Sequence, residues 1–300
     1  MLLQSMNRSL RRAVICALGL ALAAFAANAL GVIRPLWPGL TVNAGSQGPQ
    51  QAGPPLKTFP LFARNASTGK LRAYEANGTG GLKAAYELGG GFGEATALVQ
   101  ANVSEGGRAH DLYHRAGGTL YYTAEHGNDT KVIGGGWESY DTIVSVGNMG
   151  GSAEPDLIAR DASGYLWLYQ SKPDGTLEVR LRVGVGWGGM TLVGRGDYTG
   201  DGKADLLARF GDGTLNIYAG TGSATVDAVV ATRYAVGGGW QAYKTLASAG
   251  DTDGDGKTDL IAADTAGALW LFKGTGNAAA PFAPRVQIGT SGWAAFDVLF

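Results

Sequence analysis

Short apolar stretches recur along the chain beyond residue 57, each followed by a glycine-containing polar turn and a second apolar stretch. Five such units align with one another: FPLFARNASTGKLRAY, HDLYHRAGGTLYYT, PDLIARDASGYLWLY, ADLLARFGDGTLNIY and TDLIAADTAGALWLF. The alternation of apolar and polar positions is typical of half-buried β-strands, and a short turn with glycine is typical of a hairpin. The pattern therefore predicts a β-hairpin in each unit.

The hairpins return at a nearly constant spacing. Their turn glycines are 49, 46, 49 and 54 residues apart, at Gly69, Gly118, Gly164, Gly213 and Gly267. A second shared segment lies between them: GGGFGEATALV, GGGWESYDTIV, GVGWGGMTLVG, GGGWQAYKTLA and GTSGWAAFDVL. A period near fifty residues with four short strands is typical of a propeller blade. We expect an all-β fold, a five-bladed β-propeller over residues 58–300.

The two ends of the array predict how the ring closes. The first hairpin, from residue 59, has no strand before it in its blade, and residues 294–300 form a strand with no blade of their own. Pairing the C-terminal strand with the first blade would complete that blade and remove two exposed sheet edges.

The first 57 residues have a different composition. Arg8, Arg11 and Arg12 precede an apolar run over residues 13–29 that ends in the small-x-small sequence Ala27-Asn28-Ala29. This pattern predicts a signal peptide over residues 1–29 and export by the Sec or Tat route, with retention as a membrane anchor as the alternative. Residues 30–57 are rich in Pro, Gly and Gln and predict an extended tether.

The charge of the chain bears on its partners, and its cysteine content bears on how the fold is stabilised. The formal net charge of −1 gives no basic surface for nucleic acid, which we exclude as a partner. The only cysteine, Cys16, lies in the signal segment, so the exported chain has no disulfide. A bound metal is one way to stabilise a chain without disulfides.

Two acidic turns precede the fourth and fifth hairpins. The turn DTDGDGKTD places Asp251, Asp253, Asp255 and Asp259 at positions 1, 3, 5 and 9, with the Lys257 carbonyl at position 7. The turn DYTGDGKAD repeats this register with ligands at Asp197, Thr199, Asp201, Lys203 (carbonyl) and Asp205. Alternating oxygens in a glycine-rich loop favour Ca²⁺, so we expect about two ions, with ordinary Asx turns as the alternative.

These turns differ from an EF-hand, because Ala262 and Ala208 stand where its bidentate glutamate would be. The corresponding turns of the second and third blades keep Asp111 and Asp156 but lose most of the other oxygens, so we expect them to be metal-free.

Aromatic and arginine side chains also recur at fixed places. A tryptophan follows glycine in four connections between blades, as Trp137, Trp187, Trp240 and Trp293, with Phe92 in the first. These rings are either wedges between blades or platforms for a ligand, together with Tyr140 and Tyr243. Arg160 and Arg209 end hairpin strands and either bind ligand or pair with a turn carboxylate such as Asp161.

The acidic turn, the hairpin and the Gly-Trp segment together resemble FG-GAP/VCBS repeats of integrin-α-like propellers, most of all those of secreted actinobacterial proteins. The resemblance extends over residues 57–300 and is strongest in the last two repeats. It implies calcium in the two matched turns. It also implies a binding role toward sugars or proteins, as in lectin-like propeller subunits of larger toxin or adhesion assemblies.

Catalytic motifs are absent from the sequence. His110, His114 and His126 lie in one repeat without a nucleophile motif, and no HExxH, GxSxG or Walker sequence occurs. We therefore expect a secreted, calcium-stabilised, non-catalytic module that binds a carbohydrate or cell-surface glycan. The alternatives are a scaffold for another secreted protein, without a sugar ligand, and a five-bladed glycosidase-like enzyme.

Overall fold

The computed structural model describes residues 58–104, 109–125 and 129–300. They belong to one compact unit, Gly39–Phe300. The predicted signal peptide and tether, residues 1–29 and 30–57, lie outside the described residues. Within the described residues, no helix has the length and apolar character needed to cross a bilayer.

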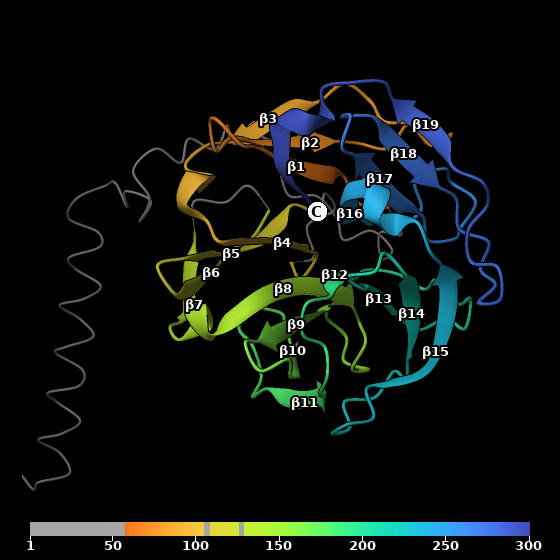
Figure 1. Cartoon of the computed structure of the whole chain (residues 1–300). Helices are drawn as coiled ribbons and strands as arrows, with labels where there is room; N and C mark the ends of the chain where they lie inside the picture. The colour runs from red at the N-terminus through yellow and green to blue at the C-terminus, as the bar shows by residue number, and fades with distance from the viewer. Residues whose placement is uncertain (1–57, 105–108, 126–128) are drawn as a thin grey trace, which may run out of the picture. The chain divides into compact units, whose positions relative to one another are not determined.

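Five antiparallel sheets of four strands each stand around one axis (Figure 1), which confirms the predicted five-bladed β-propeller. Blade I contains β20 (Phe296–Leu299), β1 (Leu61–Asn65), β2 (Leu71–Tyr74) and β3 (Tyr86–Gly89), and blade II contains β4 (Ala97–Ala101), β5 (Asp111–Ala116), β6 (Thr119–Thr123) and β7 (Lys131–Gly134). Blade III contains β8 (Tyr140–Gly147), β9 (Asp156–Asp161), β10 (Leu166–Gln170) and β11 (Leu181–Gly184). Blade IV contains β12 (Thr191–Val193), β13 (Leu206–Arg209), β14 (Leu215–Gly220) and β15 (Val230–Gly237), and blade V contains β16 (Tyr243–Ala247), β17 (Leu260–Asp264), β18 (Leu269–Phe272) and β19 (Val286–Gly289).

The ring closes as the two chain ends predict. Strand β20 pairs antiparallel with β1, with Ala63 opposite Leu299 and Arg64 opposite Val298. Beyond these pairs, Phe62 and Phe300 exchange two backbone hydrogen bonds of 2.9 and 3.0 Å. The last strand of the chain is thus the innermost strand of the first blade, beside the axis in Figure 1.

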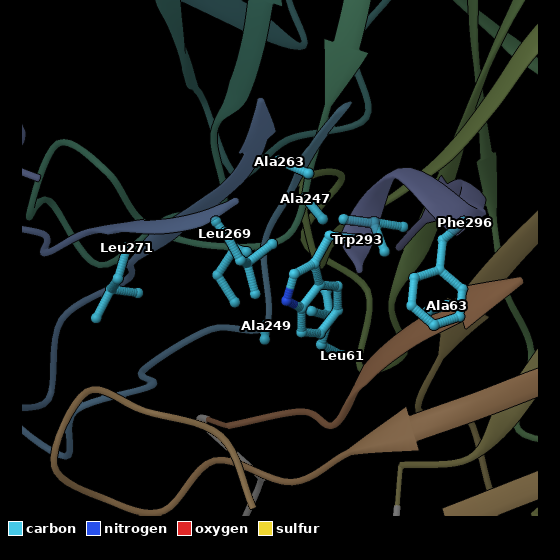
Figure 2. Packing of buried hydrophobic residues seen from close by; sticks show 11 residues of the cluster. Leu61, Ala63, Ala247, Ala249, Ala263, Leu269, Leu271, Trp293 and Phe296 are labelled. Atoms are coloured by element: carbon cyan, nitrogen blue, oxygen red, sulfur yellow. The ribbon is translucent and has the colours of Figure 1, made fainter. Parts of the chain in front are cut away.

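The hydrophobic core is divided among the junctions between blades. Each blade is apolar on both faces near its centre, so it buries one face against each neighbour. Figure 2 shows the junction of blades V and I, where Trp293 lies among Leu61 of β1 and Leu269 and Leu271 of β18. Four further clusters occupy the other junctions.

Candidate functional site

The Gly-Trp segments form the connections from one blade to the next. Four of them fold as one-turn 3-10 helices: η1 (Phe92–Glu94), η2 (Trp137–Ser139), η3 (Trp240–Ala242) and η4 (Trp293–Ala295). The residue before each helix is a glycine with φ between 84° and 92°, a conformation that costs glycine little and other residues more. Trp187 follows Gly186, whose φ of 86° is the same.

The aromatic side chains of these segments are wedges between blades. Trp137, Trp187, Trp240 and Trp293 are 6–9% exposed, and each belongs to the core cluster of its own junction. Each indole ring packs on an aromatic ring of the following blade at 4.4–4.7 Å between centroids, with partners Tyr169, Tyr218, Phe272 and Tyr74. This packing fits the wedge alternative, and ligand contact by Trp137, Trp187 and Trp240 stays a prediction.

Each wedge is fixed by the backbone of the blade before it. The Trp137 amide donates to the carbonyl of the hairpin glycine Gly118 at 3.0 Å, and the Trp240 amide donates in the same way to Gly213 at 3.0 Å. Phe92, Trp187 and Trp293 repeat the bond to their own hairpin glycines. The repeated hairpin glycine is therefore part of the blade junction as well as of the turn.

The repeated arginines complete the same junctions. Arg160 Nη1 donates to the carbonyls of Trp187, at 3.0 Å, and of Met190. Arg209 Nη1 donates to the carbonyls of Trp240 and Tyr243, at 3.1 and 2.5 Å. Arg64 and Arg115 make the corresponding pair of bonds to the next connection. We call this arrangement the arginine clamp. In each clamp, one guanidinium donates to two carbonyls of the following connection: that of the aromatic residue after the glycine and that of the residue three positions later.

The clamp arginines pair with the neighbouring strand of their own blade. Arg160 Nε donates to Asp141 at 2.7 Å, whereas Arg209 Nη2 donates to the Thr191 hydroxyl at 3.1 Å. Pairing with the turn carboxylate Asp161 is therefore wrong. Asp161 accepts from Trp167 Nε1 at 2.9 Å and from amides of its own turn, because the hairpin directs its side chain away from Arg160. A ligand role for Arg160 and Arg209 stays a prediction, although these bonds already occupy much of each guanidinium.

Blade V obtains the same bond from a different residue. Ala263 occupies the strand position of the clamp arginine, so no guanidinium is present there. Lys244 on the neighbouring strand β16 instead donates Nζ to the Phe296 carbonyl at 3.1 Å. The Phe296 carbonyl, which a clamp arginine would bind in the other blades, therefore still has a cationic donor.

The acidic turn between β16 and β17 brings three of its carboxylates together. Oxygens of Asp251, Asp253 and Asp259 lie within 4.8 Å of one another, close enough to share one cation. Asp255 is not in this group, because its Oδ1 accepts from the Lys257 amide at 2.9 Å and its Oδ2 lies 3.4 Å from the Lys257 ammonium. Among the positions that the sequence predicts, positions 1, 3 and 9 thus converge and position 5 does not.

The charges around this group oppose one another. Burial disfavours ionisation of Asp253, but the Lys273 ammonium 2.9 Å away holds its pKa below the ordinary value. Burial raises the pKa of Asp259 to about 6, against hydrogen bonds from the Gly274 and Thr252 amides. A hard dication fits this donor set of carboxylate oxygens, and it would compete with Lys273 for Asp253.

The acidic turn of blade IV is more open. Asp197 accepts from the amides of Gly200 and Gly202 at 2.6 and 2.7 Å, and the Thr199 hydroxyl lies 3.4 Å from its Oδ1. Asp201 is exposed, and its carboxylate lies 3.9 Å from Lys203 Nζ. The described carboxylates of this turn do not form a group of three as in blade V. Thr199 at the place of Asp253 is one difference between the two turns.

The aspartate at position 9 has a structural role in every acidic turn, including the two degraded ones. Asp205 accepts from the amides of Tyr198, Thr199 and, across the blade, Gly220. Asp156 accepts from Met149 and Gly150 amides at 2.9 and 2.6 Å, and burial raises its pKa to about 6. Asp111 binds the Val103 and Ser104 amides and the Tyr122 hydroxyl in the same way.

A surface pocket of about 450 Å³ opens at the junction of blades V and I. Its lining combines the rings of Tyr74, Trp293 and Phe296 with the polar side chains of Asn65 and Arg72. Sequence reasoning named Trp293 as a ligand residue but missed Asn65, Arg72 and Tyr74, because the first repeat is the least regular. The cyclic alignment of the repeats, which places Tyr74 after the last Gly-Trp segment, is the signal that could have found them.

The corresponding surfaces of blades III and V are covered by an arginine. Arg180 lies over the Trp167 ring at 4.0 Å and donates to the Tyr140 hydroxyl. Arg285 repeats both contacts with Trp270 and Tyr243. In blade I, the strand pairings place Ala85 at the position of Arg180 and Arg72 at the position of Trp167. Neither can reproduce the stacked pair.

Two described histidines lie inside blade contacts. His110 Nε2 lies 2.9 Å from the Tyr86 hydroxyl, and burial lowers the pKa of His114 to about 4, so that its ring is neutral near pH 7. His114 stacks on Tyr121 at 5.0 Å between centroids. His126 lies outside the described residues.

Comparison with known proteins agrees with this architecture. Residues 197–262 match the model of the FG-GAP-like repeat family, and this match and the five-bladed fold together support the FG-GAP propeller family that the repeats predict. The secreted actinobacterial type stays a prediction. A search of curated proteins finds no match.

Comparison with solved structures gives matches at low sequence identity. One, described under "The de novo evolutionary emergence of a symmetrical protein is shaped by folding constraints", is 17% identical with a TM-score of 0.54, over 80% of this chain and 97% of that chain. A protein of unknown function from Bacteroides caccae is 10% identical with a TM-score of 0.38, over 76% of this chain and 73% of that chain. At these identities, the likeness of the first structure supports the propeller fold alone.

Proposed function

We propose that this FG-GAP propeller is an exported, non-catalytic binding module whose ligand is a carbohydrate or cell-surface glycan. The observation that carries the proposal is the pocket of about 450 Å³ at the junction of blades V and I, with its aromatic rings and its exposed arginine. Export follows from the predicted signal peptide, and the predicted membrane anchor remains the alternative.

The pocket has the chemistry that sugar recognition uses. The half-buried ring of Tyr74 offers apolar surface for the C–H face of a pyranose ring and also has a hydroxyl, whereas the rings of Trp293 and Phe296 line the pocket but are largely buried. Arg72 is exposed at the rim and supplies hydrogen-bond donors for sugar hydroxyls or a carboxylate. The volume of the pocket suits one or two sugar residues rather than a folded domain.

The differences between blades favour one main site over five equal ones. At blades III and V, Arg180 and Arg285 lie over Trp167 and Trp270, the side chains at the position that Arg72 has in blade I. At blade I, Ala85 leaves the corresponding place uncovered. We therefore assign the ligand to the V–I junction, and any avidity would come from multiple copies of the protein.

Calcium is the second part of the proposal. The convergence of Asp251, Asp253 and Asp259 supports one ion in the turn of blade V. The repeated register of Asp197, Thr199, Asp201 and Asp205 supports a second ion in blade IV, where binding requires Asp201 to turn inward from Lys203. The ions would stabilise the turns between the first two strands of these blades, and nothing in this role requires turnover.

A glycan array with the full chain tests the binding role. The wild-type protein, Arg72→Ala and Arg233→Ala are compared at roughly millimolar calcium, since extracellular calcium modules bind in that range. Arg233 is an exposed arginine of β15, so its substitution is a matched control for loss of one surface charge. We expect Arg72→Ala to weaken glycan binding about tenfold, which corresponds to ~1.4 kcal/mol, with an unchanged melting temperature.

Two outcomes would contradict the proposal. If the wild-type chain retains no glycan but is retained by a protein from the same surface, the scaffold alternative takes its place. If glycans bind equally well to the wild-type protein and Arg72→Ala, the V–I pocket is not the site.

A further inference from the structure

Arg195 is a buried arginine at the centre of the propeller. It follows β12, is 8% exposed and has a φ of 65°, which a non-glycine residue adopts at some cost. The preceding residue must be glycine, because a Cβ on Gly194 would lie 2.1 Å from the Ser145 carbonyl oxygen of β8. The chain is thus pressed against the neighbouring blade where Arg195 enters the axis.

The contacts of Arg195 leave one edge of its guanidinium without a partner. Nη1 donates to Gln100 Oε1 at 2.5 Å and lies 3.4 Å from the Ser248 carbonyl, while Nη2 donates to the Gln100 carbonyl. The Phe59 ring covers one face at 4.4 Å. Nε–H and the second Nη2–H have no hydrogen-bond partner among residues 58–104, 109–125 and 129–300. These two hydrogens form the side-on fork that binds a carboxylate in a bidentate manner.

No acidic side chain of the described segments forms an ion pair with Arg195. Its contacts are to an amide, two carbonyls and an aromatic ring. Burial lowers the pKa of Arg195 to about 10, because a guanidinium inside the protein loses its hydration without gaining a counter-charge. An unpaired buried charge is costly, and an anion is the partner that would offset this cost.

A cavity lies beside Arg195 on the propeller axis. It has a volume of about 90 Å³ and is lined by residues of the innermost strands β4, β8, β12, β16 and β20 and by Arg195. Ser145 of β8 also lines it, and its Oγ is a buried hydroxyl with no hydrogen-bond partner among the described residues. Gln100 and Ser248 line it too, and most of the other lining residues are apolar, with Leu98, Val193 and Leu246 among them.

We propose that this axial cavity is a binding site for a small carboxylate, held by the Nε/Nη2 edge of Arg195 and by the Ser145 hydroxyl. The planar fork selects a planar two-oxygen anion over a spherical halide. The apolar walls and the small volume limit the rest of the ligand to a few carbon atoms, so acetate and formate are suitable probes.

A second, larger cavity also has Arg195 in its lining. It has a volume of about 450 Å³ and is lined by Phe59, Arg195 and residues of both acidic turns. Asp197 and Asp251 contribute negative charge to it, and Lys203 and Lys257 contribute positive charge. Because the aspartates would repel an entering carboxylate, the measurement is made at fixed calcium and fixed ionic strength.

The test compares sodium acetate with sodium chloride at equal ionic strength, read by the melting temperature of the full chain and by acetate titration calorimetry. We expect acetate to raise the melting temperature of the wild-type protein by a few degrees more than chloride does. Arg195→Gln and Arg195→Lys should each weaken acetate binding at least tenfold, since lysine keeps the charge but not the fork. Arg233→Gln, which removes an exposed charge, should leave it unchanged.

Ser145→Ala gives a second test that does not depend on Arg195 variants folding. Its hydroxyl has no partner in the part of the chain that the structure describes, so the variant should fold normally and bind acetate several-fold more weakly. Equal effects of acetate and chloride on the wild-type protein would overturn the assignment. Acetate binding that survives both Arg195→Lys and Ser145→Ala would overturn it as well. The glycan experiment does not depend on this outcome, because Arg72 and Arg195 line different cavities.

Discussion

Replacing Arg160 tests whether the arginine clamp holds neighbouring blades together. Arg160 is buried, and its guanidinium donates to two carbonyls of the Trp187 segment, to Asp141 and to the Thr142 hydroxyl. Arg160→Met keeps the length of the apolar stem but removes all of these donors. The variant therefore leaves the Trp187 connection without its side-chain anchor in blade III, while the backbone bond from the Trp187 amide to the Gly164 carbonyl remains.

The expected loss follows from these contacts. Hydrogen bonds to a charged donor contribute about 1.5–3 kcal/mol each, and breaking a buried ionic arrangement costs about 3–5 kcal/mol. Because Asp141 is 47% exposed and will be solvated in the variant, its share is small. We therefore expect Arg160→Met to lower the free energy of unfolding by about 3–5 kcal/mol, most of it from the two unpaired carbonyls.

Urea unfolding followed by tryptophan fluorescence measures this loss, with Arg233→Met as the matched control on an exposed strand. A gain-of-clamp variant gives a second check. Ala263→Arg combined with Lys244→Thr rebuilds in blade V the arrangement of Arg209 and Thr191 in blade IV, so it should be neutral or stabilising. A loss below about 1 kcal/mol for Arg160→Met, or an equal loss for the control, would refute the reasoning.

Three further predictions concern closure, calcium and pH. Deleting residues 296–300 removes β20 and the burial of Phe296 and Leu299, which contributes about 1.5–3 kcal/mol for each side chain. We expect this deletion to abolish cooperative melting, whereas deletion of residues 1–57 should not. Chelation with EGTA should lower the melting temperature, because calcium at a hundredfold excess over its dissociation constant stabilises the fold by about 2.7 kcal/mol per site. Metal analysis of Asp251→Asn should find one calcium ion fewer than in the wild-type protein. An indifferent melting temperature would exclude calcium. The folded pKa of Asp156, about 6, lies above its unfolded value of 3.8, so its contribution to stability is fully present below pH 3.8 and lost as the pH rises through 6. Relative to Asp156→Asn, the wild-type protein should lose up to ~3 kcal/mol between these pH values, and parallel stability curves would contradict this.

The sequence was sufficient to predict the fold because the residues that define a blade are locally required. A turn needs its glycine, and a connection needs Gly136 or Gly239 at positive φ before its wedge. The closing pair of β20 and β1 followed from counting strands in the repeat. Blade boundaries are therefore visible without any long-range information.

The arginine clamp was not predicted because its contacts join residues of different repeats. Arg160 reaches a connection 27 residues further along the chain, and no local pattern indicates which carbonyls it binds. Comparison of the repeats does contain a signal. The strand residue beside the clamp is Asp141 or Thr191 where an arginine is present, and Lys244 where it is replaced by Ala263.

The acidic turns show how one residue can serve two purposes. Asp156 binds its turn amides without the other acids of the calcium pattern, so an aspartate at position 9 does not by itself indicate metal. What distinguishes the turn of blade V is that Asp251 and Asp253 converge on Asp259. Since the position-9 carboxylate already orders the turn, acids at positions 1 and 3 bring three carboxylates together on an existing scaffold. The degraded turns of blades II and III keep that scaffold, because Asp111 and Asp156 still accept hydrogen bonds from the amides of their turns.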